Sequence, residues 1–108
     1  MKVPPHQYDA TVAFYRDILG FPLLEEFAPS VVVEFGPNRL WIDRVPTASQ
    51  AELWLEVVTD DVDAAARRFT AAGVTRCDEI EPLREGFAGF WIASPASVVH
   101  LVCTPEDA

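Results

Sequence analysis

Basic residues, cysteines and long apolar runs are all scarce in this chain. Of its 108 residues only eight are Lys or Arg, against 17 Asp or Glu, and the formal net charge is −9. Surfaces that bind nucleic acids or anionic membranes need clustered basic side chains, so this balance argues against both partners. No apolar run approaches the roughly 18 residues needed to span a bilayer. We therefore expect a soluble chain with neither nucleic acid nor membrane as a partner.

The two cysteines, Cys77 and Cys103, show no Cys-x-x-Cys spacing, and the chain does not start with the charged and apolar regions of a secretory signal. These features predict a reducing, cytoplasmic location in which both thiols are structural. Half of the residues are hydrophobic and 11% are aromatic. That composition is sufficient to build the core of one domain.

Two helix-like segments each end at a glycine. The first is predicted from about Tyr8 to Leu19, before Gly20, and the second starts at Asp60 and Asp61 and ends before Gly73. A carboxylate at a helix start caps unpaired N–H groups, and glycine at a helix end adopts the left-handed conformation. The two glycines lie 53 residues apart in a chain of 108. This spacing predicts two copies of one supersecondary unit.

Short strands fill the rest of the sequence. Well-marked strands are predicted at 31–35, 39–44, 53–58, 89–93 and 98–103, and weaker ones at 2–3, 23–27 and 76–80. The segments Gly36-Pro37-Asn38 and Ser94-Pro95-Ala96-Ser97 predict turns. Each half is then a strand, a helix and three strands, which makes the fold class α+β. Module one is expected at about 1–45, a connector at about 46–51 and module two at about 52–108.

A family resemblance rests on three segments: Val12-Ala13-Phe14-Tyr15-Arg16-Asp17-Ile18-Leu19-Gly20-Phe21, the run from Asp61 to Gly73, and Ser94-Pro95. On these residues the chain resembles the vicinal oxygen chelate superfamily, which includes glyoxalase I, bleomycin-resistance proteins, extradiol dioxygenases and methylmalonyl-CoA epimerase. The resemblance implies a single glyoxalase/bleomycin-resistance-like domain over 1–108. Its two βαβββ modules would enclose a central cavity with mixed, curved sheets. Because this fold hosts many chemistries, the resemblance does not specify a reaction.

Metalloenzymes of this superfamily carry ligands at four strand positions, and two of these are lost here. The first position would precede the chain, and the second falls on Trp54, whose indole cannot ligate a cation. The third falls on or near Trp41, with Asp43 further along the same face. The fourth falls on His100 if the preceding turn is one residue shorter, and on Leu101 otherwise. The resemblance therefore implies no metal and no cofactor, and it leaves enzymatic activity uncertain, with the balance against it.

Strand alternation gives a separate view of the site, because successive side chains point to opposite faces of a sheet. The set expected to form core is Leu40, Ile42, Leu53, Leu55, Val57, Val99, Leu101 and Cys103. Within it, the apolar face of 53–57 should pack on a helix. The residues that alternate with this core set point to the other face, and we add Trp91 to them. The resulting set is Arg39, Trp41, Asp43, Trp54, Glu56, Trp91 and His100.

We interpret this second set as the lining of one ligand pocket, because apolar walls with a few polar groups suit a small ligand. In this interpretation His100 lines the pocket and is not catalytic, and no catalytic residue is assigned. Two alternatives stay open. The face is also what the wetted side of an antiparallel sheet looks like. In addition, Asp43, Glu56 and His100 offer the two carboxylates and imidazole of a non-haem iron site.

The function predicted is metal-independent binding of a small, partly apolar molecule in the central cavity, as in a resistance or sequestration protein. The alternative is a metal-dependent lyase, isomerase or dioxygenase of the same superfamily, and a third is a ferredoxin-like regulatory domain without a cavity. Small members of the superfamily commonly pair chains, so a homodimer is expected, with Phe87, Phe90 and Trp91 as candidates for the covered surface. Arg67 and Arg68 are expected on a solvated helix face.

Overall fold

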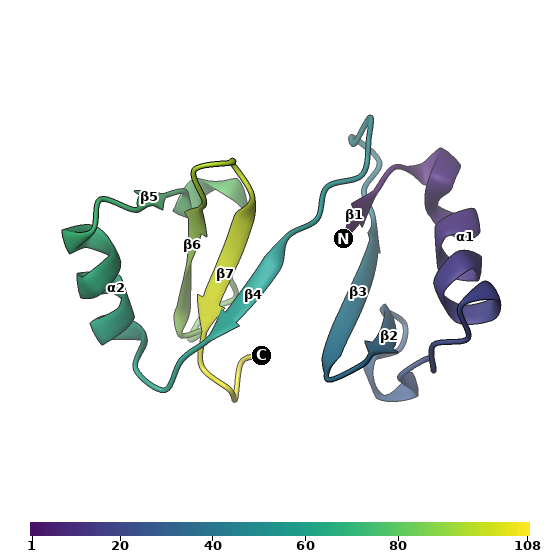
Figure 1. Ribbon diagram of the computed structural model, residues 1–108, viewed down its shortest axis with the longest axis horizontal. Coiled ribbons are helices and arrows are strands. Elements are labelled where there is room, and N and C mark those ends of the chain that lie inside the picture. The colour runs from purple at the N-terminus through teal and green to yellow at the C-terminus, as the bar shows by residue number, and fades with distance from the viewer. The chain divides into compact units, whose positions relative to one another are not determined.

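A computed structural model describes all 108 residues, and the chain divides into two compact units, Met1–Leu53 and Trp54–Ala108 (Figure 1). The first unit contains β1 (Lys2–Val3), α1 (Pro5–Ala13), β2 (Val31–Phe35) and β3 (Asn38–Arg44). The second unit contains β4 (Leu55–Val58), α2 (Val62–Ala71), β5 (Thr75–Arg76), β6 (Gly89–Ala93) and β7 (Val99–Cys103). Each unit thus starts with a strand and a helix and ends with an antiparallel hairpin, so the predicted α+β repeat is confirmed.

The first unit is built on a three-stranded sheet in the order β1-β3-β2. Its helix starts at Pro5, where a missing N–H costs nothing, and continues through a π-helical turn, Phe14–Ile18. Gly20 follows with φ +74°, so the predicted glycine stop is confirmed. The helix packs on the sheet face that carries Ile42, where Val3 and Val12 are also buried and Leu40 packs against them.

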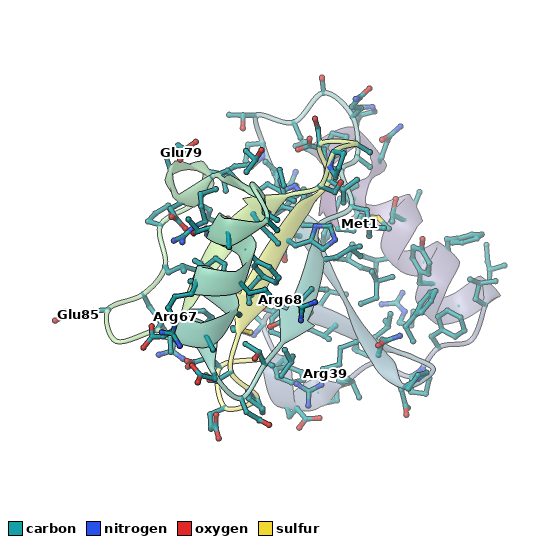
Figure 2. The ribbon with its side chains drawn as sticks, turned by 60° about the vertical axis from the view of Figure 1, so that its left-hand side comes forward. Met1, Arg39, Arg67, Arg68, Glu79 and Glu85 are labelled. Atoms are coloured by element: carbon teal, nitrogen blue, oxygen red, sulfur yellow. The ribbon has the colours of Figure 1, made fainter.

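The second unit has a four-stranded sheet in the order β4-β7-β6-β5. Asp61 caps α2, because its Oδ1 accepts a hydrogen bond of 2.9 Å from the Ala64 N–H, and Gly73 ends the segment with φ +74°. The Phe69 ring of α2 lies 6.2 Å from the Phe90 ring of β6, which places the helix on that face of the sheet. Arg67 and Arg68 are exposed on α2, as predicted (Figure 2).

Both predicted turns are present. Phe35 and Asn38 pair across a two-residue loop in which Gly36 has φ +60°, the position where a type II′ hairpin turn takes glycine. In the second unit the Ser94 carbonyl accepts from the Ser97 N–H at 2.8 Å, and the Ser94 hydroxyl accepts from the Val98 N–H at 3.2 Å. These bonds fix the reversal between β6 and β7.

The two weaker strands are shorter than predicted. Residues 23–27 contribute one bridge, between Leu23 and Val33, and then turn into a 3₁₀ helix at Glu25–Phe27. Residues 76–80 leave the sheet after Arg76 and form a 3₁₀ helix at Asp78–Ile80. Here the carboxylate of Asp78 accepts the backbone N–H of Trp91 at 3.0 Å. A side chain that accepts a hydrogen bond from a backbone N–H of the sheet competes with pairing between strands, which is why β5 ends early.

The prediction that Leu53, Leu55 and Val57 pack on a helix is wrong. Their side chains are 51%, 44% and 40% exposed. The reason is the sheet order: β4 is an edge strand, whereas α2 lies over β6 through Phe69 and Phe90. Alternation places these residues on the helix side of the sheet, but the helix is not long or central enough to cover the edge.

Candidate functional site

In the first unit, the sheet face away from the helix carries a cluster of aromatic and charged side chains. Leu40 and Ile42 point toward α1, so alternation along β3 sends Arg39, Trp41 and Asp43 to the other face, as predicted. The strand register confirms the grouping, because Trp41 pairs with Val32 on one side of β3 and Asp43 pairs with Lys2 on the other.

Phe27 completes this first cluster, and sequence reasoning missed it. Its ring lies 5.0 Å from the Trp41 ring, and the Arg39 guanidinium stacks over it at 5.0 Å. Phe27 reaches this position from the 3₁₀ helix at Glu25–Phe27. This segment has no periodic pattern of apolar residues, so the sequence did not indicate the direction of the Phe27 side chain. Asp43 is bonded to the Lys2 ammonium, with Nζ to Oδ2 at 3.1 Å, so its carboxylate is already paired.

In the second unit, the register of three strands decides which residues share a face. Glu56 pairs with Leu101, and Leu101 pairs with Trp91, so these three side chains form one row on the face away from α2. Trp54 precedes β4 by one residue and lies two residues before Glu56. Its indole contacts that of Trp91, with ring centroids 5.3 Å apart in an edge-to-face arrangement. Three of the four residues predicted for this unit are therefore together.

His100 is the fourth, and its predicted placement is wrong. His100 pairs with Leu55 and Ile92. It lies on the same face as Val102 and Phe90, which is the face that α2 covers. The imidazole Nδ1 lies 2.9 Å from the carbonyl of Val98, the residue just before β7, so a polar partner is available there. Leu101 takes the position facing Glu56. The alternative alignment of the last strand, without the shortened turn, is the one that the structure supports.

The same geometry removes the proposed iron-type ligand set. Glu56 and His100 point to opposite faces of one sheet and cannot bind the same ion together. Asp43 is held by Lys2. More generally, no three His, Cys, Asp or Glu side chains come together in an arrangement that could hold a metal ion.

A carboxylate–thiol pair lies beside the two indoles. The Cys103 thiol donates to Oε1 of Glu56, with Sγ to Oε1 at 2.9 Å. Burial, together with this hydrogen bond to a carboxylate, raises the pKa of Cys103 to about 12. At neutral pH Cys103 is therefore a protonated, unreactive donor. It was predicted to be core and it is fully buried, but on the face of Glu56 and not under the helix.

Trp91 is the fixed member of the indole pair. Its side chain is 5% exposed, and its indole N–H donates to the Glu81 carbonyl at 2.9 Å. Trp54 is only half-buried. The suggestion that a partner chain covers Phe90 and Trp91 is wrong, because both are already buried in the single chain. Phe87 is half-buried, with the Arg84 guanidinium 5.1 Å from its ring.

A separate hollow of about 580 Å³ lies on the helix side of the second unit. Its polar lining includes Asp60, Asp61, Asp63 and Arg76, and none of the seven predicted site residues borders it. Asp61 already caps α2, and Arg76 is bonded to Asp78 at 2.6 Å. We do not assign the binding function to this hollow.

The fold is that of a glyoxalase-like protein. A family model for the glyoxalase-like domain matches residues 3–103. The chain belongs to this family, and with it to the vicinal oxygen chelate superfamily predicted from the sequence. No curated protein matches the sequence closely enough to count as a relative. None of the helices is both long and apolar enough to cross a membrane.

Solved structures share the fold at low sequence identity. A glyoxalase/bleomycin resistance protein/dioxygenase superfamily member from Vibrio splendidus is 14% identical over 95% of this chain and 94% of that chain, with a TM-score of 0.58. The NAD-dependent benzaldehyde dehydrogenase structure from Legionella pneumophila is 16% identical over 90% of each chain, with a TM-score of 0.60. TnmS3, an antibiotic-binding protein from Streptomyces, is 24% identical over 97% of this chain and 92% of that chain, at a TM-score of only 0.38. The first two likenesses extend to the fold alone, and the third carries no structural argument.

Among this superfamily's metalloenzymes, the second and fourth ligand positions correspond here to Trp54 and Leu101. Neither side chain has a donor atom for a divalent cation. Of the two carboxylates in the predicted site, Asp43 is bonded to Lys2 and Glu56 to Cys103. The residues present do not fit a catalytic metal ion.

Proposed function

We propose that this chain binds a small, partly apolar molecule on its aromatic sheet faces without the help of a metal ion. The observation that carries the proposal is the Trp54–Trp91 pair, with ring centroids 5.3 Å apart on the face of Glu56. Trp91 is buried and fixed by its bond to Glu81, so it gives rigid support to the half-buried Trp54, which can pack against a ligand. Rigid aromatic surface next to a few polar groups is the usual composition of a small-molecule site.

The first unit supports the same function with a parallel arrangement. Trp41 and Phe27 provide aromatic surface, and Arg39 is held over Phe27 as an exposed cation. Each unit therefore has a helix on one side of its sheet and aromatic side chains with a charged group on the other. We further propose a cytoplasmic location, which suits two free thiols.

The proposal is tested by screening small molecules against the purified protein. A ligand should raise the melting temperature and should shift the indole N–H signals in a ¹⁵N-correlated NMR spectrum, where the three tryptophans give three resolvable signals. We expect the signal of Trp54 to move most and that of Trp91 to move less. A broad screen in which no compound moves either signal would contradict the proposal.

The purified protein is expected to carry no stoichiometric divalent metal. Trp54 and Leu101 offer no donor atoms, and no three potential ligands converge. Elemental analysis of protein prepared without chelators measures this directly. About one equivalent of zinc, nickel, iron or manganese per chain would instead favour a metal-dependent lyase, isomerase or dioxygenase.

A homodimer is the expected assembly. Phe14, Leu19 and Phe35 are between 43% and 45% exposed in the first unit, and Ile18 is 75% exposed. Exposed apolar groups of this kind mark interaction surfaces. Light scattering should give twice the chain mass of 12.0 kDa, and Ile18→Glu should shift the mass toward the monomer, whereas Thr70→Glu on exposed α2 should not. A concentration-independent monomer would contradict this expectation.

A further inference from the structure

Glu56 is the only charged side chain among the strand residues on its face of the second sheet. The register places Val58, Cys103 and Gly89 in the row on one side of it, and Val99, Ala93 and Thr75 in the row on the other. Its own row contains Leu101 and Trp91, and Trp54 lies next to it along the chain. A carboxylate is thus set among uncharged strand residues and beside two indoles.

This carboxylate has no basic partner. Its hydrogen-bond donor is the neutral thiol of Cys103, which is a weak donor and occupies only Oε1. The arginines of the second unit are used elsewhere: Arg76 bonds Asp78 and stacks over Phe90 on the helix side, and Arg84 bonds Asp107. Arg67 and Arg68 stand on the exposed side of α2 (Figure 2). The negative charge of Glu56 is therefore available to a ligand.

The chemistry of this neighbourhood selects one ligand class. An indole face attracts a cation through its quadrupole, and a carboxylate attracts it by charge, so both groups favour the same kind of guest. A flat ring on that guest would pack against the half-buried Trp54. The formal net charge of −9 adds a field that raises the local concentration of cations and repels anions.

We infer that the Trp54–Trp91–Glu56 surface is selective for an aromatic cation, namely a protonated or quaternary amine attached to a flat ring. This inference rests on the proposed function, because it specifies the ligand class of the same site. Glu56 acts as a specificity residue, and the half-buried Trp54, which packs on the buried Trp91, supplies most of the aromatic contact area.

Three probes with the same ring test the inference: (2-naphthylmethyl)trimethylammonium, 2-naphthylmethanol and 2-naphthylacetate. Equilibrium dialysis against the full chain measures each affinity. We expect the cation to bind at least about tenfold more tightly than the alcohol, and the carboxylate to bind more weakly than the alcohol. The advantage of the cation should decrease as salt concentration rises.

The isosteric variant Glu56→Gln separates the charge from the rings. It should reduce the preference for the cation over the alcohol to about twofold or less while leaving the affinity for the alcohol nearly unchanged. Glu85→Gln is the matched control, because it removes the same charge from an exposed loop of the same unit (Figure 2) and should leave the preference intact. Far-ultraviolet circular dichroism checks that both variants are folded.

The outcomes distinguish this inference from the proposed function. If cation and alcohol bind equally well, and Glu56→Gln changes nothing, the aromatic site stands and the selectivity for cations is wrong. An equal loss of preference in Glu56→Gln and Glu85→Gln would assign the effect to net charge and overturn the role of Glu56. If none of the three naphthyl probes binds, the inference is overturned, and the proposed function is then decided by the broad screen.

Discussion

Replacing Trp54 with alanine is expected to weaken ligand binding by at least about tenfold while the fold stays intact. Trp54 is half-buried and contributes an indole face beside Glu56, so its removal deletes ligand-contacting surface. Because its side chain is not fully packed, the free energy of unfolding should fall by less than the roughly 3–5 kcal/mol typical of a core tryptophan. Dialysis with the naphthyl cation and urea denaturation measure the two effects.

Trp91→Ala is the comparison that makes the Trp54 result interpretable. Its indole is 5% exposed and donates a hydrogen bond to the Glu81 carbonyl, so truncation leaves both a cavity and an unpaired carbonyl. We expect a loss of about 3–5 kcal/mol in the free energy of unfolding. Comparable destabilisation by both substitutions would show that Trp54 is a core residue. Unchanged ligand affinity in Trp54→Ala would remove it from the site.

Local chemistry was enough to predict the order of the helices and the well-marked strands in both units. Gly20 and Gly73 end the helical segments with positive φ, and Asp61 caps α2 through a direct hydrogen bond. These features act within a few residues of the chain, so they can be seen without knowledge of the tertiary structure. The face of β3 was predictable for a related reason, since Leu40 and Ile42 contrast clearly with Arg39 and Asp43 on the same strand.

The face of β7 was not predictable, because that contrast is missing. β7 lies between β4 and β6 and has buried residues on both faces, such as Val102 under the helix and Cys103 beside Glu56 (Figure 1). A strand that is apolar on both sides has no alternation to interpret. His100 suggested a polar face, but its bond to the Val98 carbonyl gives it a partner on the helix side. Only strand pairing reveals this arrangement.

Burial at the sheet edge is a tertiary property and was also missed. The sequence pattern places Leu55 on the correct side of β4, but whether a helix covers it depends on sheet order and helix position. Phe27 is a similar case, since an irregular segment carries it to Trp41 and Arg39. The positions of site residues were therefore predicted correctly where neighbouring residues in the sequence differ in polarity. They were predicted wrongly where segments distant in the sequence determine the environment.

A pair of substitutions on one face of the second sheet tests this conclusion. Val102 and Leu55 both point to the helix side, but Val102 is 0% exposed and Leu55 is 44% exposed. Val102→Ala removes fewer carbon atoms, yet it should lower the free energy of unfolding by about 2 kcal/mol or more, because the lost methyl groups leave a cavity. Leu55→Ala should cost less than about 1 kcal/mol, as expected for a surface position.

Urea denaturation of both variants at low protein concentration measures these differences, and the denaturant slope shows whether the transition keeps its cooperativity. Low concentration matters because association of two chains would add stability that depends on concentration. If Leu55→Ala destabilised the protein as much as Val102→Ala, β4 would be packed in solution as the alternation of its sequence predicts. A large effect at Val102 with a small one at Leu55 would instead establish that β4 is an uncovered edge, and that position in the sheet, not side-chain size, sets the contribution of each residue.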